Sequence, residues 1–132
     1  MRMTKARKAI METLERAKTP LSAQAVYEAL KVSADPATVY RNLHALEDEG
    51  LADSFILHCA GHGTERYYTA LTGHNGIGDG AHRHWFHCEK CHRFTDLGSC
   101  KLAPLVADFE ASHGLTVRAH SLYLTGICAR CR

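Results

Sequence analysis

Hydrophobic residues in the first third of the chain recur every three or four positions, which is the spacing of one buried helical face. The pattern predicts three helices, whose start signals are Thr4, Ser22 and the pair Asp35 and Pro36. Gly50 is expected to end the third helix. The predicted buried positions are Ala6, Ile10, Leu14 and Ala17, then Ala25, Val26, Ala29 and Leu30, and finally Val39, Leu43 and Leu46.

The spacing changes to alternation after the third helix, which indicates strands. Residues 51–57 and 66–71 are predicted to form a hairpin. Three short helices followed by a hairpin are typical of a winged helix-turn-helix domain, which we place at residues 1–72. Residues 73–81 contain four glycines and are predicted to form a hinge before a small α/β domain at residues 82–132. The expected fold class is therefore α/β, of the α+β type.

Composition adds an abundance of metal-binding residues. The 132 residues include 10 His and 6 Cys, whereas 16 Lys and Arg against 14 Asp and Glu leave a net charge of only +2. So small an excess does not by itself indicate nucleic-acid binding, which has to rest on the local placement of charge. No run approaches the ~20 apolar residues of a membrane helix, and no signal peptide is evident. We therefore expect a soluble, cytoplasmic protein whose paired cysteines bind metal.

Two Cys-x-x-Cys pairs, Cys88 with Cys91 and Cys128 with Cys131, form the strongest motif. Each pair places two thiolates on one tight turn, and two such turns complete the tetrahedron of a structural zinc ion. The 36 residues between the pairs exceed a compact zinc ribbon, so the ion is expected to staple a helix-and-strand unit. A disulfide or a redox pair is the alternative, although a thioredoxin-like pair should open a helix after a strand. Four thiolates leave no open coordination position, which predicts a structural and not a catalytic site.

A second metal site is predicted at His82, His84 and His120, with surface histidines as the alternative. Side chains alternate along an extended chain, so His82 and His84 project to one side. His120 is expected to begin a strand that leads to the second cysteine pair, and pairing of the strands would bring it close. Cys100 is the favoured fourth ligand. Other donors with an open role are Asp96, His87 and His92 nearby, Cys59, His58 and His62 in the hairpin, and His74 and Asp79 in the hinge.

The third predicted helix carries side chains suited to DNA. In a winged helix-turn-helix domain this helix lies in the major groove. Arg41 and Asn42 have hydrogen-bonding forks that read base edges, and Tyr40 offers a flat apolar contact to a thymine methyl. A solvated helix face is the alternative, because such small domains also serve as protein-interaction modules. The predicted DNA-binding set is Lys5, Arg7 and Lys8, a basic arm for phosphates, together with Thr38, Tyr40, Arg41 and Asn42.

Further short motifs follow one another along nearly the whole chain. They are Thr4-x-x-Arg7, Leu21-Ser22-Ala23 with Val26-Tyr27, Ala37-Thr38-Val39-Tyr40-Arg41-Asn42-Leu43, Glu49-Gly50-Leu51, His82-x-His84 before Cys88-x-x-Cys91, Asp96-Leu97, and His120-Ser121-Leu122-Tyr123 before Cys128-x-x-Cys131. Together they resemble the ferric uptake regulator family of bacterial metal-responsive repressors. The resemblance implies a homodimer with an N-terminal winged helix and a C-terminal α/β dimerisation domain. It also implies that a second metal acts as corepressor for a palindromic operator.

Carried over by position, the resemblance implies structural zinc at the four cysteines of the two pairs. It implies regulatory ligands at the three histidines, and DNA contacts from Tyr40 and Arg41. Three positions depart from the family pattern. The Glu often found in the helix after the first cysteine pair is replaced by Ala103, and the expected hinge-site histidines are Arg83 and Trp85. The glycine-rich loop before the second domain is also longer than usual, so the sensory site is expected to be rebuilt.

Imidazoles with an available thiolate favour zinc over Mn²⁺ or Fe²⁺ as the regulatory metal. We therefore expect a zinc-responsive repressor of metal uptake, of the zinc uptake regulator type. Manganese, iron or peroxide sensing within the family, and a zinc-stapled interaction module outside it, are the alternatives. No enzyme or small-molecule substrate is expected, because no motif supplies a general base beside the histidines. No membrane partner is expected either, because no apolar run has the length of a membrane helix. The expected mechanism is a population shift, in which a metal held by both halves fixes two recognition helices about 34 Å apart.

Overall fold

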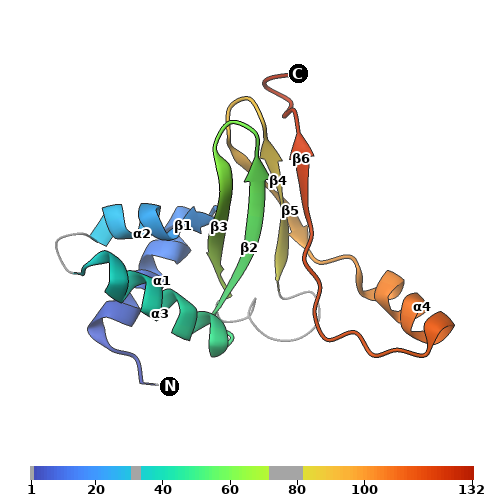
Figure 1. Cartoon of the computed structure of the whole chain (residues 1–132), viewed down its shortest axis with the longest axis horizontal. Helices are drawn as coiled ribbons and strands as arrows, with labels where there is room; N and C mark the ends of the chain where they lie inside the picture. Colours follow the sequence, from blue (N-terminus) through green and yellow to red (C-terminus); the bar gives the residue numbers. More distant parts are fainter. Residues whose placement is uncertain (1, 31–33, 72–81) are drawn as a thin grey trace. The chain divides into compact units, whose positions relative to one another are not determined.

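The computed structural model describes residues 2–30, 34–71 and 82–132 of the chain. The chain divides into two compact units, Met1–Gly76 and Ile77–Arg132. Each unit has its own three-stranded sheet (Figure 1). The predicted hinge at residues 73–81 lies outside the described residues. None of the six cysteines, all of which lie within the described residues, forms a disulfide bond.

The first unit begins with helices whose starts are capped as the sequence predicts. The hydroxyl of Thr4 accepts a hydrogen bond from the backbone N–H of Arg7 at 3.2 Å, and the carboxylate of Asp35 accepts one from Thr38 at 2.7 Å. Each cap satisfies an N–H group that the helix itself leaves unpaired. The elements are α1 (Lys5–Ala17), β1 (Leu21–Ser22), α2 (Ala23–Leu30), α3 (Pro36–Asp48), β2 (Ala52–Cys59) and β3 (Gly63–Ala70), with strand order β1-β3-β2.

The core of the first unit lies where the three helices meet the sheet. The helical periodicity locates it well: Ile10 on α1 and Val39, Leu43 and Leu46 on α3 are all 0% exposed. Burial of side chains of this size contributes about 1.5–3 kcal/mol each. The prediction for Ala29 is wrong, because this residue near the end of α2 is exposed. The core residues are Ile10, Met11, Leu14, Val26, Val39, Leu43, Leu46, Ala52 and Tyr68.

The predicted hairpin is confirmed, with longer strands. Strands β2 and β3 pair antiparallel from Ala52 opposite Ala70 to Cys59 opposite Gly63, so Cys59 belongs to a strand and not to the turn. Gly63 has φ +81°, a conformation that favours glycine at the start of the returning strand.

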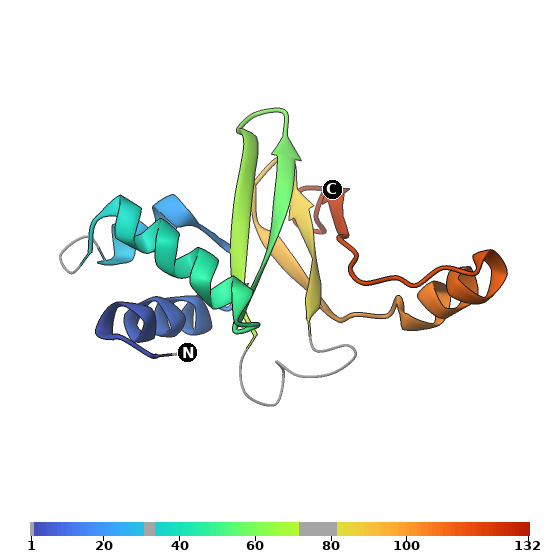
Figure 2. The ribbon, with the colours of Figure 1, turned by 60° about the horizontal axis from the view of Figure 1, so that its bottom comes forward.

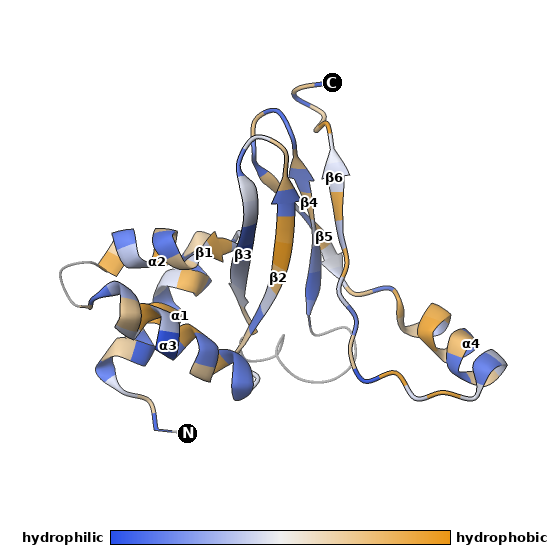
Figure 3. Ribbon diagram, viewed as in Figure 1, coloured by the Kyte–Doolittle hydropathy of each residue, from blue (hydrophilic) through white to orange (hydrophobic). Residues whose placement is uncertain are grey.

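The second unit consists of β4 (Arg83–Cys88), β5 (Phe94–Ser99), α4 (Ala103–His113) and β6 (Tyr123–Gly126), with strand order β5-β4-β6. The central strand β4 pairs antiparallel with β5 and parallel with β6. Its residues Trp85, His87 and Cys88 are buried. In contrast, α4 has no buried residue, although Figure 3 shows hydrophobic positions along it. No helix within the described ranges has the length and apolar character needed to cross a membrane.

Candidate metal centres and DNA-binding face

The four cysteines of the two Cys-x-x-Cys pairs meet at one end of the second sheet. Strand β4 ends at Cys88, opposite Gly126 of β6, and this parallel register brings the turn containing Cys128 beside the turn containing Cys91. All four sulfur atoms lie within 4.8 Å of one another, and the sulfur atoms of Cys91 and Cys128 are 3.7 Å apart. A tetrahedral zinc ion with bonds of about 2.3 Å separates its sulfur ligands by about 3.8 Å. The sulfur cage therefore fits zinc.

The electrostatics of this cage favour partial ionisation. The backbone N–H of Cys91 donates to the sulfur of Cys88 and lowers the pKa of that thiol to about 6. The sulfur of Cys128 is a hydrogen-bond partner of the Cys131 thiol, which raises the pKa of Cys131 to about 12. Four thiolates this close repel one another, so full ionisation requires a cation. Zinc binding at the cage therefore releases protons and weakens as the pH falls.

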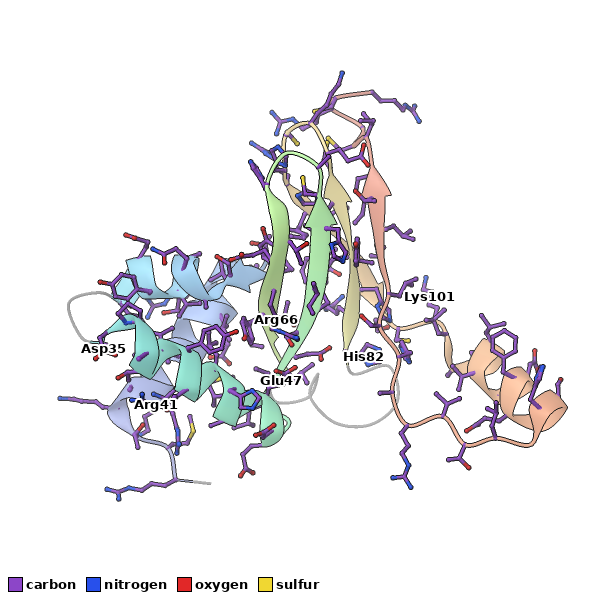
Figure 4. All side chains as sticks on the ribbon, in the orientation of Figure 1. Asp35, Arg41, Glu47, Arg66, His82 and Lys101 are labelled. Carbon is purple, nitrogen blue, oxygen red and sulfur yellow. The ribbon has the colours of Figure 1, made fainter. Side chains whose placement is uncertain are left out.

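A second cluster lies near the other end of β4 and contains His82, His84, Cys100 and His120. Figure 4 labels His82, which directly precedes this strand. The backbone N–H of Cys100 donates to the carbonyl of His82 at 3.0 Å, which continues the pairing of β4 with β5. His120 arrives on the segment between α4 and β6. Three chain segments far apart in the sequence thus supply the four donors.

The four donor atoms converge on one point. The Nε2 atom of His120 lies 2.9 Å from Nε2 of His82, 3.3 Å from Nε2 of His84 and 3.3 Å from the sulfur of Cys100. Ligand nitrogens around a tetrahedral zinc ion are separated by about 3.3 Å, given bonds of about 2.0–2.1 Å. The Nδ1–H group of His84 donates to the carbonyl of Leu122 at 2.9 Å, which leaves its Nε2 lone pair directed at the centre. Such a partner fixes the ligating tautomer.

Two sequence expectations about this cluster need correction. The prediction that His120 begins a strand is wrong, since β6 begins only at Tyr123. All four donors come from the second unit, so this cluster does not include the expected ligands from both halves. Asp96 instead forms an ion pair with Arg83 at 3.1 Å.

The remaining candidate donors are placed as follows. His87 is buried on β4 and His92 follows Cys91 with φ +64°, whereas Ala103 begins α4. In the first unit, Cys59 is buried at the end of β2, His58 lies with its Nδ1 2.7 Å from the hydroxyl of Thr64, and His62 is in the hairpin turn. His74 and Asp79 lie outside the described residues.

The predicted DNA-binding residues separate into an exposed group and a half-buried group. Tyr40 is 56% exposed, and Arg41, labelled in Figure 4, is also exposed on α3. Lys5 and Lys8 are exposed on α1. The half-buried residues are Arg7, Thr38 and Asn42.

The sequence did not reveal that Arg7 and Asn42 bind one another. The guanidinium Nε–H of Arg7 donates to Oδ1 of Asn42 at 2.9 Å, across 35 positions of the sequence. A signal was present in the helical spacing, because position 42 follows Val39 by three residues and precedes Leu46 by four. Asn42 therefore borders the buried face of α3.

Comparison with known proteins supports the fold. The sequence profile described as the ferric uptake regulator family matches residues 1–125. No curated protein sequence matches this chain. A solved structure described as "Structure of Prokaryotic Transcription Factors" has a TM-score of 0.72 at 24% identity, covering 99% of this chain and 98% of that chain.

Two further solved structures have informative descriptions. The Helicobacter pylori ferric uptake regulator, reported with three functional metal-binding sites, has a TM-score of 0.69 at 18% identity, with 99% of this chain and 82% of that chain covered. A zinc uptake regulator complexed with zinc and DNA has a TM-score of 0.68 at 20% identity, with coverages of 99% and 83%. These likenesses confirm the predicted fold class, an N-terminal DNA-binding domain followed by a small α/β dimerisation domain.

Proposed function

We propose that this chain, which belongs to the ferric uptake regulator family of metal-responsive, DNA-binding transcription regulators, is a cytoplasmic, zinc-responsive repressor of metal uptake. In this proposal, zinc in the four-cysteine cage is structural. A second zinc ion at the cluster of His82, His84, Cys100 and His120 is the corepressor. The active species is a homodimer bound to a palindromic operator.

The observation that carries the choice of metal is the position of Cys100. Its sulfur lies 3.3 Å from Nε2 of His120, among the three imidazoles. One thiolate with three imidazoles is a donor set that suits tetrahedral zinc, whereas Mn²⁺ and Fe²⁺ favour more carboxylate or water oxygen. Ala103 cannot supply a carboxylate in place of the thiolate.

The positions of the four ligands along the chain support a coupling between metal binding and DNA binding. His82 directly precedes β4, so among the four ligands it is the one nearest in sequence to the DNA-binding unit. Cys100 precedes α4 and His120 follows it, so one ion ties both ends of this segment to the start of β4. The ion then restricts the arrangements that the two DNA-binding units sample. A coupling of about 1–3 kcal/mol changes operator affinity about 5- to 150-fold.

Exposed apolar side chains of the second unit support the homodimer. On α4, Leu105 is 48% exposed and Phe109 is 50% exposed, and Leu124 on the edge strand β6 is 49% exposed. An isolated helix of 11 residues is marginal in water, so α4 needs a surface to pack against. A second copy of the chain provides it, because an isologous interface lets the same apolar face cover itself.

The test is DNA binding as a function of free metal. Protein whose four-cysteine cage is loaded with zinc is first used to select a duplex from a random-sequence pool, in parallel selections with excess Zn²⁺, Mn²⁺ or Fe²⁺. Fluorescence anisotropy then measures binding at fixed salt, with buffered Zn²⁺, Mn²⁺ or, without oxygen, Fe²⁺. We expect zinc to switch binding on at a far lower free concentration than the other two ions. A switch by manganese or iron at cellular concentrations overturns the choice of zinc.

A matched variant isolates the contribution of the thiolate. Cys100→Asp keeps an anionic ligand but replaces sulfur with oxygen. The free zinc needed for half-maximal DNA binding should rise at least tenfold, because the softer donor is lost, while the requirement for Mn²⁺ changes less. Equal shifts for both metals contradict a selective role for Cys100. The absence of any metal-dependent DNA binding by the unmodified protein favours a zinc-stapled interaction module.

A further inference from the structure

The contact between Arg7 and Asn42 joins two helices that both belong to the proposed DNA-binding surface. Arg7 lies on α1, the helix that carries Lys5 and Lys8, and Asn42 lies on α3, the helix that carries Tyr40 and Arg41. Figure 2 shows the two helices side by side within the first unit. The question is whether these two residues contact DNA or set the geometry of those that do.

The amide of Asn42 is committed on both sides. Its Oδ1 accepts from Arg7 at 2.9 Å, and its Nδ2 donates to the carbonyl of Thr38 at 3.0 Å, one helical turn earlier. These two partners fix the orientation of the amide, because a flipped amide would place N–H groups against N–H groups. Bidentate reading of adenine needs both Oδ1 and Nδ2 directed at the base. Asn42 is therefore not available as a base reader in this arrangement.

Arg7 is also held by the residues that precede α1. Its backbone N–H donates to the capping hydroxyl of Thr4 at 3.2 Å, and its Nη1 donates to the carbonyl of Arg2 at 2.8 Å. The planar guanidinium thus connects the N-terminal end of α1 to the middle of α3. A lysine carries its N–H groups on a single nitrogen, so it cannot reproduce two contacts that come from separate guanidinium nitrogens, Nε and Nη1.

We propose that Arg7 and Asn42 are positioning residues that fix the phosphate-binding arm of α1 relative to the base-reading face of α3. Sequence-specific binding requires phosphate contacts and base contacts to form together in one register. Lys5 and Lys8 lie on one helix, and Tyr40 and Arg41 lie on the other, so their relative placement depends on how α1 and α3 are joined. The hydrogen-bonded pair holds this placement. The inference rests on the proposed DNA-binding function.

The test measures affinity for the selected duplex and for an unrelated duplex, with zinc present throughout. Arg7→Lys and Asn42→Ala should each lower the ratio of specific to non-specific affinity about tenfold, in line with the loss of one hydrogen bond to a charged group. The double variant should lose no more than either single variant, because both act through one contact. Non-specific affinity should change less than about twofold in the full-length variants. Thermal unfolding followed by circular dichroism checks that each variant is folded.

Two further variants separate positioning from direct contact. Lys8→Ala, which alters an exposed phosphate contact, should weaken both duplexes equally and reduce the salt dependence by about one unit. Asn42→Asp keeps an acceptor for Arg7 but can donate neither to a base nor to the carbonyl of Thr38. It should therefore retain the specificity ratio within about twofold while lowering affinity for both duplexes.

The possible outcomes are distinct. Unchanged specificity in Arg7→Lys with a loss in Asn42→Asp overturns the inference and makes Asn42 a base reader. Additive losses in the double variant overturn it as well. Failure of the unmodified protein to bind any selected duplex in a metal-dependent way contradicts the proposed function itself, before any variant is compared.

Discussion

At the scale of single residues, position within a cluster decides the chemistry of identical side chains. Cys88 and Cys131 belong to one cage, yet the pKa of Cys88 is lowered to about 6 and that of Cys131 is raised to about 12. The first accepts hydrogen bonds from backbone N–H groups, and the second shares a proton with a neighbouring sulfur. Cys100, outside the cage, has imidazoles as neighbours instead. These three cysteines thus have three different environments, and they divide into two roles, structural in the cage and regulatory at Cys100.

This division of roles predicts different outcomes for two substitutions. Cys88→Ser should unfold the second unit, because structural zinc contributes directly to folding. His120→Ala should leave that unit folded but abolish zinc-dependent DNA binding. Trp85, the only tryptophan of the chain, is 5% exposed on β4, so its fluorescence reports the second unit alone. We expect a red shift of the emission in Cys88→Ser and none in His120→Ala; a red shift of equal size in both contradicts the division.

The four-cysteine cage could be predicted more completely from the sequence than the second metal cluster. Spacing alone pointed to the four-cysteine cage, because two residues between cysteines place both sulfurs on one turn. For the second cluster, alternation joined only His82 and His84, and their meeting with Cys100 and His120 depends on strand pairing at long range. Asn42 shows the opposite problem. The helical spacing places it beside the buried face of α3, but nothing in the sequence identifies its partner, which lies 35 residues away.

At the scale of secondary-structure elements, local signals fix the helices of the first unit. α3 illustrates this, since Asp35 caps it, Pro36 opens it and Gly50, with φ +76°, follows its end. These signals involve neighbours in sequence, so they are readable without the fold. β6 is different, because four residues with little alternation become a strand only through parallel pairing with β4. The start of that strand was accordingly misplaced at His120.

The cap of α3 gives a prediction with a defined pH dependence. Asp35→Ala should lower the unfolding midpoint of the first unit by a few degrees, while Asp35→Asn, which keeps an acceptor, should stay close to the unmodified chain. The backbone N–H of Thr38 lowers the pKa of Asp35 below 3.8. The ionised carboxylate therefore stabilises the fold above pH 3.8, and this contribution is lost as the pH falls through the lowered pKa.

Circular dichroism melts of the three proteins between pH 7 and pH 2.5 measure this effect. The advantage of the unmodified chain over Asp35→Asn should disappear at the acidic end of the range. An advantage that stays constant to pH 2.5 shows that the charge of Asp35 does not stabilise the helix.

At the scale of the whole molecule, the two units differ in how completely they bury their apolar residues. The first unit has a core of nine buried residues, whereas α4 in the second unit has none. Helical periodicity predicted the core of the first unit, because the helices of that unit bury one another's apolar faces. Periodicity could not predict that α4 lacks buried residues, since a helix face that the chain itself leaves uncovered has the same apolar pattern as one that it buries.

If the apolar face of α4 forms the proposed homodimer interface, a charge placed on this face should dissociate the dimer. Phe109→Glu should weaken the dimer about a hundredfold or more, because each copy loses a buried aromatic contact and two copies share the interface. Sedimentation velocity over a concentration series measures the change. Ile56→Glu is the control, since Ile56 is 42% exposed on β2 of the other unit and should leave the dimer intact. Dimers of equal strength in both variants contradict the assignment of this face.

The placement of both metal clusters on β4 has a consequence for the fidelity of the signal. His84 lies near one end of this six-residue strand and Cys88 ends it, and the parallel register with β6 is shared by both clusters. An oxidant or chelator that removes zinc from the four-cysteine cage should therefore also disturb the pairing of β4 with β6. This pairing places Leu122 and His120 next to His84. Under the proposed function, such damage reaches the promoter as a false message of zinc scarcity, and the cell responds by importing metal that it already holds.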